Sequence, residues 1–99
     1  IMLNKETLSK LDSIQESITR VRKYKDNPKL YLLGKLTEES GEIAKEIVKG
    51  IEGKSQGKDM ASELGDLFWV INALAIEEGI KLSEIIQILF LKLEERKLL

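Results

Sequence analysis

Apolar residues recur at intervals of three and four along most of this chain, which is the spacing of one face of an α-helix. The first stripe predicts a helix over Lys5 to Lys25, and the second predicts a helix over Lys29 to Lys49. No segment alternates apolar and polar residues over a useful length, so no β-strand is predicted. The apolar positions are Leu8, Leu11, Ile14, Ile18 and Val21 in the first stripe, and Leu32, Leu33, Leu36, Ile43, Ala44, Ile47 and Val48 in the second.

The connections between these helices hold residues that favour helix ends. Asn27 is expected to cap the second helix, and Pro28 follows it at the first helical position, where the missing N–H of proline is tolerated. Residues 50–58 contain three glycines and two lysines, which predicts a loop.

Two further helices are expected after that loop. Asp59 is expected to cap a third helix that runs to Glu78, and Gly79 ends it because glycine readily adopts the left-handed conformation found there. Ser83 is expected to cap a fourth helix. Four helices joined by short connections predict an all-α protein, an antiparallel four-helix bundle. The apolar positions of the fourth helix are Ile85, Ile86, Leu89, Phe90 and Leu93.

The third helix is apolar on nearly every side. Between Leu67 and Ile76 the only polar residue is Asn72. A helix that is apolar all round is buried all round, and a four-helix chain of this length can hardly surround one of its own helices. We therefore expect the third helix to pack against another copy of the chain, in a homodimer or a homotetramer.

The charge balance and the missing residue types exclude several classes of function. The chain has 99 residues, one small domain over residues 2–99, with 17 acidic and 16 basic side chains and a net charge of −1. Without a basic excess, nucleic acid is not an expected partner. Cysteine and histidine are both absent, which excludes disulfides, zinc knuckles, thiol catalysis and mechanisms that use imidazole. The chemistry is left to carboxylates, amines, hydroxyls or a bound metal.

No membrane or targeting segment is evident. The stretch from Leu67 to Ile76 is the longest nearly uncharged apolar run, and it is about half of the ~20 residues that a membrane span needs. We expect a cytoplasmic protein with no membrane partner.

Two acidic pairs stand at helical spacing on neighbouring predicted helices. Glu39 and Glu42 lie three residues apart on the second helix, as do Glu63 and Asp66 on the third, so each pair shares one helix face. Carboxylates at the edge of a core are costly unless they are paired or bind a cation. Oxygen ligands without His or Cys favour Mg²⁺, with Mn²⁺ as a substitute. The alternative is a solvated acidic face on a non-enzymatic helical interaction module.

With these acids, the chain resembles the MazG-like, all-α nucleoside triphosphate pyrophosphohydrolases. The matching motifs are Glu38-Glu39-x-x-Glu42 and Glu63-x-x-Asp66. The resemblance covers roughly residues 30–96, within a motif-bearing core of about 29–97.

The resemblance implies an activity and roles for the five acids. It implies a Mg²⁺-dependent hydrolase that cleaves nucleoside or deoxynucleoside triphosphates between the α- and β-phosphates, giving a monophosphate and pyrophosphate, in nucleotide-pool cleansing. By the motif match, Glu39, Glu42, Glu63 and Asp66 hold the metal. Glu38 orients or deprotonates the attacking water.

Five further residues are candidates for binding the substrate. Lys35 lies one turn before the acidic motif, and Lys92 and Arg96 form a basic pair on the fourth helix that resembles one in the family. The resemblance suggests contact of Asn72 with the sugar or base, and Trp69 offers a ring for stacking. The alternatives are solvated charge for the three basic residues, a hydrogen bond to another helix for Asn72, and ordinary core packing for Trp69.

The nearest alternative enzyme is phosphoribosyl-ATP pyrophosphohydrolase of histidine biosynthesis, which has a related acidic motif. That family typically carries a histidine soon after the second acidic pair. This chain has Trp69 and Val70 there and no histidine anywhere, so the resemblance to it is weaker.

Overall fold

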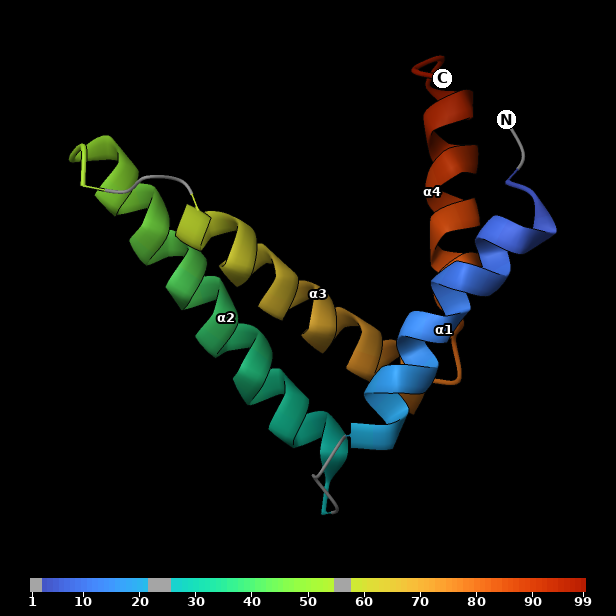
Figure 1. Cartoon of the computed structure of the whole chain (residues 1–99), viewed down its shortest axis with the longest axis horizontal. Helices are drawn as coiled ribbons and strands as arrows, with labels where there is room; N and C mark the ends of the chain where they lie inside the picture. Colours follow the sequence, from blue (N-terminus) through green and yellow to red (C-terminus); the bar gives the residue numbers. More distant parts are fainter. Residues whose placement is uncertain (1–2, 22–25, 55–57) are drawn as a thin grey trace.

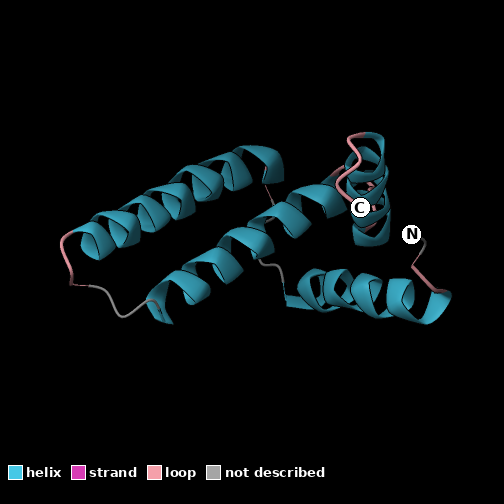
Figure 2. Cartoon of the chain, turned by 90° about the horizontal axis from the view of Figure 1, so that it is seen from above, coloured by secondary structure: helices cyan, strands magenta, loops and turns pink. Residues whose placement is uncertain are grey.

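A computed structural model describes residues 3–21, 26–54 and 58–99 of the protein. These residues form four α-helices and no β-strand, which confirms the all-α prediction (Figure 2). The helices are α1 (Lys5–Val21), α2 (Pro28–Ile51), α3 (Lys58–Glu77) and α4 (Leu82–Glu95). The end expected for the first helix, residues 22–25, lies outside the described residues.

The start of α2 and the end of α3 follow the sequence prediction. Pro28 is the first residue of α2, and the Asn27 side chain accepts a hydrogen bond from the backbone N–H of Leu30 at 3.4 Å. At the end of α3, Gly79 has a φ of 70°, in the left-handed region that favours glycine. The N–H of Ile80 reaches back to the carbonyl of Ala75 at 2.8 Å, which completes the C-terminal cap.

Two predicted caps are wrong. α3 begins at Lys58, so Asp59 lies inside its first turn. Its negative charge there still interacts favourably with the positive end of the helix dipole. The N-cap of α4 is Lys81, whose side chain makes no capping bond, and Ser83 is the second residue of the helix. Asp12 of α1 provides the missing acceptors.

The contact of Asp12 with Ser83 ties α4 to α1. Asp12 Oδ1 accepts the backbone N–H of Ser83 at 3.0 Å, and its Oδ2 accepts the Ser83 hydroxyl at 2.9 Å. One turn further along α1, Gln15 Nε2 donates to the carbonyl of Ile80 at 3.1 Å. Since these two side chains hold the α3–α4 connection, the direction of α4 depends on α1.

The core is small and lies where α1, α2 and α3 meet. α2 packs antiparallel along α3, α1 crosses α3, and α4 packs on α1 (Figure 1). The buried apolar residues of this core are Ile18, Leu32, Val70 and Ala73, with Leu36, Leu74 and Ile76 packed against them.

The four helices do not close into one bundle within a single chain. α4 stands away from α2, so the chain forms two arms that meet near the end of α3 (Figure 1). The radius of gyration is 15.9 Å, against about 13 Å for a compact domain of this length. The accessible surface is 7420 Å², against about 5,700 Å² for a compact monomer of this size.

The open arrangement leaves apolar side chains uncovered on both arms. As the sequence indicated, one chain does not surround α3: Val70 and Ala73 are buried, whereas Trp69 is 46% exposed. α4 is similarly uncovered. The exposed apolar residues of these two helices are Leu64, Phe68, Trp69 and Ile71 on α3, and Ile88, Leu89 and Leu91 on α4.

Within the described residues, none of the helices combines the length and the apolar character that crossing a membrane requires.

Replacing Asp12 by alanine removes both acceptors at the start of α4. We expect Asp12→Ala to lower the free energy of unfolding by about 1–2 kcal/mol, the usual cost of a lost helix cap. Urea unfolding followed by circular dichroism measures this. Glu16→Ala, one turn along α1 in an exposed pair with Arg20, is the control and should change stability by about 0.5 kcal/mol or less. Equal effects of the two variants would show that Asp12 is not a cap.

Candidate active site

The α2–α3 seam is the line of contact between these two antiparallel helices (Figure 1), and the two acidic motifs stand on its two sides. Carboxylate oxygens of Glu39, Glu63 and Asp66 all lie within 4.8 Å of one another. These three residues are called the acidic cluster below. Glu39 and Glu63 are half-buried and Asp66 is exposed, so the cluster has one side in the seam and one side open to solvent.

The acidic cluster fits a divalent cation. Glu39 Oε2 is buried and has no hydrogen-bond partner among the described residues. A buried carboxylate oxygen without a partner is costly, and a cation held between the three carboxylates would remove that cost. The donors are all hard oxygens, the ligand type that Mg²⁺ and Mn²⁺ prefer.

Glu42, the fourth predicted metal ligand, lies beside the acidic cluster. Its carboxylate contacts Lys45 Nζ at 3.9 Å on the same helix, and it is not among the three acids whose oxygens converge. Its negative charge nevertheless acts on Glu63. Glu42 is therefore a neighbour of the cluster.

The pKa of Glu63 is raised above its ordinary value of 4.5. Partial burial is the largest cause, because it disfavours the charged form. The charges of four other acids act in the same direction, in decreasing order Glu42, Asp66, Glu39 and Glu46. The seam thus holds several like charges close to Glu63.

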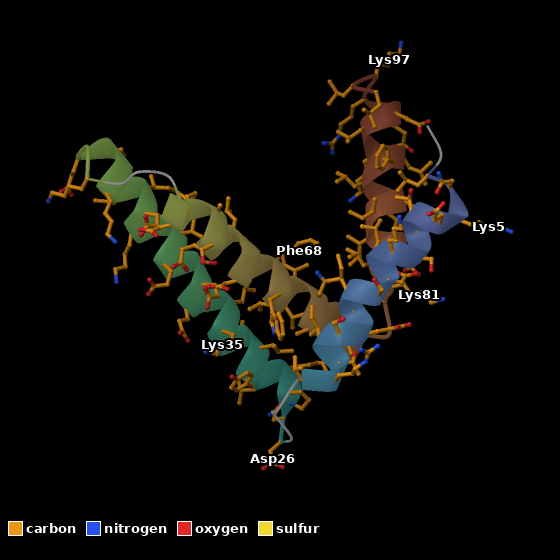
Figure 3. The ribbon with its side chains drawn as sticks, viewed as in Figure 1. Lys5, Asp26, Lys35, Phe68, Lys81 and Lys97 are labelled. Atoms are coloured by element: carbon orange, nitrogen blue, oxygen red, sulfur yellow. The ribbon has the colours of Figure 1, made fainter. Side chains whose placement is uncertain are left out.

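Lys35 and Glu38 form an ion pair next to the cluster. Lys35 Nζ lies 3.3 Å from Glu38 Oε2 and 6.0 Å from the centre of the Tyr31 ring, which is within reach of a cation–π contact. The pKa of Lys35 is raised, chiefly by the hydrogen bond to Glu38. Both side chains are partly exposed on α2, where Figure 3 labels Lys35.

Asn72 and Trp69 lie further along α3 than Glu63 and Asp66 of the acidic cluster. Asn72 is 0% exposed, and its Nδ2 donates to the carbonyl of Phe68 at 3.0 Å, while its Oδ1 has no partner among the described residues. Trp69 and Phe68 line an apolar cavity of about 330 Å³ with Ile14 and Ile18 of α1.

A single chain does not bring Lys92 and Arg96 to the acidic cluster. Lys92 lies in the last turn of α4 and Arg96 is its C-cap residue. α4 packs on α1 rather than on α2, and the labelled Lys97 in Figure 3 marks the far tip of its arm.

Sequence reasoning missed two residues of the seam, Glu46 and Lys49. The Glu46 carboxylate is buried, at 6% exposure, and Lys49 Nζ lies 3.0 Å from its Oε1. The signal was available, because Glu46 stands seven residues after Glu39 and therefore on the same face of the helix.

The raised pKa of Glu63 predicts how the stability of the metal-free protein depends on pH. The folded protein holds this proton to higher pH than the unfolded chain does, so its stability falls as the pH rises from 4.5 through the raised pKa. Glu63→Gln removes this titration, and its melting temperature should rise relative to wild type over the same interval. Thermal unfolding in EDTA from about pH 4 to about pH 7 measures the difference. Glu16→Gln is the control, and parallel profiles for wild type and Glu63→Gln would contradict the prediction.

Comparison with known proteins agrees with the motifs. Searches of curated proteins and of solved structures give no match. The MazG nucleotide pyrophosphohydrolase domain matches residues 27–98, a region that contains α2, α3 and α4 and all the acids of the cluster. Since this match spans most of the chain, the protein belongs to the MazG nucleotide pyrophosphohydrolase domain family.

Proposed function

We propose that the protein is a Mg²⁺-dependent nucleoside triphosphate pyrophosphohydrolase that cleaves its substrate between the α- and β-phosphates and acts in nucleotide-pool cleansing. The observation that carries the proposal is the convergence of Glu39, Glu63 and Asp66 from two helices within 4.8 Å. Membership of the MazG family supports the same reaction class.

The residues present suit a metal-bound triphosphate. Glu39, Glu63 and Asp66 would hold Mg²⁺, with Glu42 beside them. Bound Mg²⁺ would neutralise phosphate charge, activate water and stabilise the charge that develops on the phosphoryl oxygens. Without a cation, this group of carboxylates would repel a triphosphate.

Glu38 is the proposed base. Its carboxylate is partly exposed one position before Glu39, and it would orient the water and accept its proton as the bridging P–O bond breaks. In the free protein Lys35 holds Glu38 in an ion pair. A phosphate group that attracts Lys35 would release Glu38 for this role.

The base of the nucleotide is proposed to stack on Trp69. This ring is half-exposed at an apolar cavity between α1 and α3, close in sequence to Asp66. Asn72 is proposed to contact the sugar or base through its Oδ1, an acceptor that has no hydrogen-bond partner among the described residues.

Self-association is part of the proposal. The chain exposes roughly 1,700 Å² more than a compact monomer of its size, which exceeds the ~800 Å² that each partner buries in a standard interface. Packing of a second copy against α3 and α4 would cover Ile71 and Leu89. It also offers a route by which Lys92 and Arg96 of one copy reach the acidic cluster of another.

The reaction predicts pyrophosphate release that depends on the acidic cluster. With Mg²⁺, we expect pyrophosphate from at least one member of a panel of standard, deoxy and oxidised nucleoside triphosphates and phosphoribosyl-ATP. Glu39→Gln and Glu63→Gln should each lower kcat/KM by about 100-fold or more, because each removes a metal ligand. Glu16→Gln, on the exposed face of α1, should leave the rate unchanged.

The absence of pyrophosphate from every nucleotide, with either Mg²⁺ or Mn²⁺, would refute the proposed function. Release from phosphoribosyl-ATP alone would assign the chain to the histidine-pathway activity instead.

The exposed surface predicts a dimer or a tetramer in solution. Multi-angle light scattering at micromolar concentration should give two or four times the mass of one chain. Leu89→Asp, which places a charge on the uncovered face of α4, should shift the protein towards the monomer, since burying an unpaired charge is costly. Gln87→Asp adds the same charge to an already polar position of α4 and is the control. A monomeric wild type would refute self-association.

A further inference from the structure

Two lysines stand at equal distances on either side of Glu42 on α2. Lys35 precedes Glu42 by seven residues and Lys49 follows it by seven. Seven residues are nearly two full turns, so the three side chains leave the helix on almost the same side, each about 10 Å from the next along the axis. Lys35 and Lys49 therefore bracket the middle of the acidic seam.

Lys49 is held in place by a buried acid. Its Nζ lies 3.0 Å from Oε1 of Glu46, whose side chain is 7% exposed. The charges of Asp59 and Glu42 also favour the protonated form of Lys49, and its pKa is raised, chiefly by the hydrogen bond to Glu46. The ammonium of Lys49 therefore stands in the field of one acid of α3 and two acids of α2.

This ion pair differs from the two exposed pairs of α1. The pairs of Lys10 with Glu6 and of Arg20 with Glu16 join two side chains that are each at least 70% exposed, and such pairs contribute little to stability. In the pair of Lys49 with Glu46 the acid is buried and fixed, whereas the lysine is 49% exposed. The buried partner restricts where the ammonium lies, and the open side leaves its remaining N–H groups available to an anion.

We propose that Lys49 binds a phosphate group at one end of the substrate's polyphosphate chain, opposite the end bound by Lys35, and that Glu46 positions Lys49 for this contact. This inference rests on the proposed function, since it needs a metal-complexed polyphosphate at the acidic cluster. The ligand class is a nucleoside triphosphate as substrate and inorganic pyrophosphate as product.

Lys49 is suited to this role by charge as well as by place. The acidic cluster and its neighbours repel phosphate oxygens, and cations on both sides of the cluster would reduce that repulsion along the length of the chain of phosphates. A lysine carries a compact charge at the end of a flexible side chain. Its ammonium can therefore move from a carboxylate oxygen to a phosphate oxygen while the backbone stays in place.

The test is the affinity of the full-length protein for inorganic pyrophosphate with Mg²⁺, measured by isothermal titration calorimetry. Lys49→Met should weaken binding about tenfold, the effect of losing one charge-assisted hydrogen bond. Lys49→Arg should restore part of the affinity because it keeps the charge. Lys10→Met is the matched control: it removes the same charge from a lysine paired with a glutamate on α1, and its affinity should stay within about twofold of wild type.

Glu46→Gln separates positioning from binding. It leaves the ammonium of Lys49 present but no longer fixed by a buried charge, so we expect a smaller loss of pyrophosphate affinity than in Lys49→Met and a raised KM with kcat retained. Thermal unfolding of each variant identifies any that fail to fold, and Lys49→Arg then carries the comparison.

The outcomes distinguish this inference from the proposed function. If wild type binds pyrophosphate and hydrolyses nucleotides, but Lys49→Met binds pyrophosphate as tightly as Lys10→Met, Lys49 only neutralises Glu46 and the inference is wrong. If wild type neither binds pyrophosphate nor hydrolyses any nucleotide, the proposed function fails and the inference fails with it.

Discussion

The structure depends on the packing of α2 against α3, which holds like-charged carboxylates together. The apolar contacts that join these helices, with Leu32 on one side and Val70 and Ala73 on the other, lie in the same seam as the acids. Apolar burial therefore opposes electrostatic repulsion along one line of contact. Two signs of this opposition are the raised pKa of Glu63 and the Glu39 oxygen, which lacks a hydrogen-bond partner within the part of the chain that the structure describes. A bound cation would relieve both, so stability and metal affinity are coupled in this seam.

Ion pairs follow one another along α2 beside the carboxylates of the seam. Lys29 at the start of α2 pairs with Glu78, just beyond the end of α3, at 2.6 Å, which helps to fix the alignment of the two helices. Lys35 and Lys49 follow on α2, each paired with an acid of its own helix. Glu39, which stands between these pairs on α2, converges with Glu63 and Asp66 across the seam. The near-neutral net charge of −1 thus conceals an acidic patch with cations at its ends.

Much of the fold and part of the site could be predicted from sequence because the determining interactions are local. The cap at Asn27, the left-handed Gly79 and the helical spacing of the acids all act within a few residues. The proximity of Glu39 and Asp66 could be predicted because each of the two helices carries an acidic pair next to its apolar stripe. The spacing of Glu46 from Glu39 places it on the same helix face, but its burial, which fixes the pair with Lys49, depends on the neighbouring helix.

By itself, the sequence determined the four helices, the all-α class and the faces on which the acids stand, because helix periodicity and capping are short-range effects. Only the tertiary structure decided how far the helices close on one another. The acceptors at the start of α4 come from Asp12, 71 positions away from Ser83, and this contact helps to hold α4 on α1, away from α2. The separation of Lys92 from the acidic cluster within one chain follows from that placement. The sequence periodicity determines which side of a helix is apolar, but long-range contacts determine which other helix packs against that side.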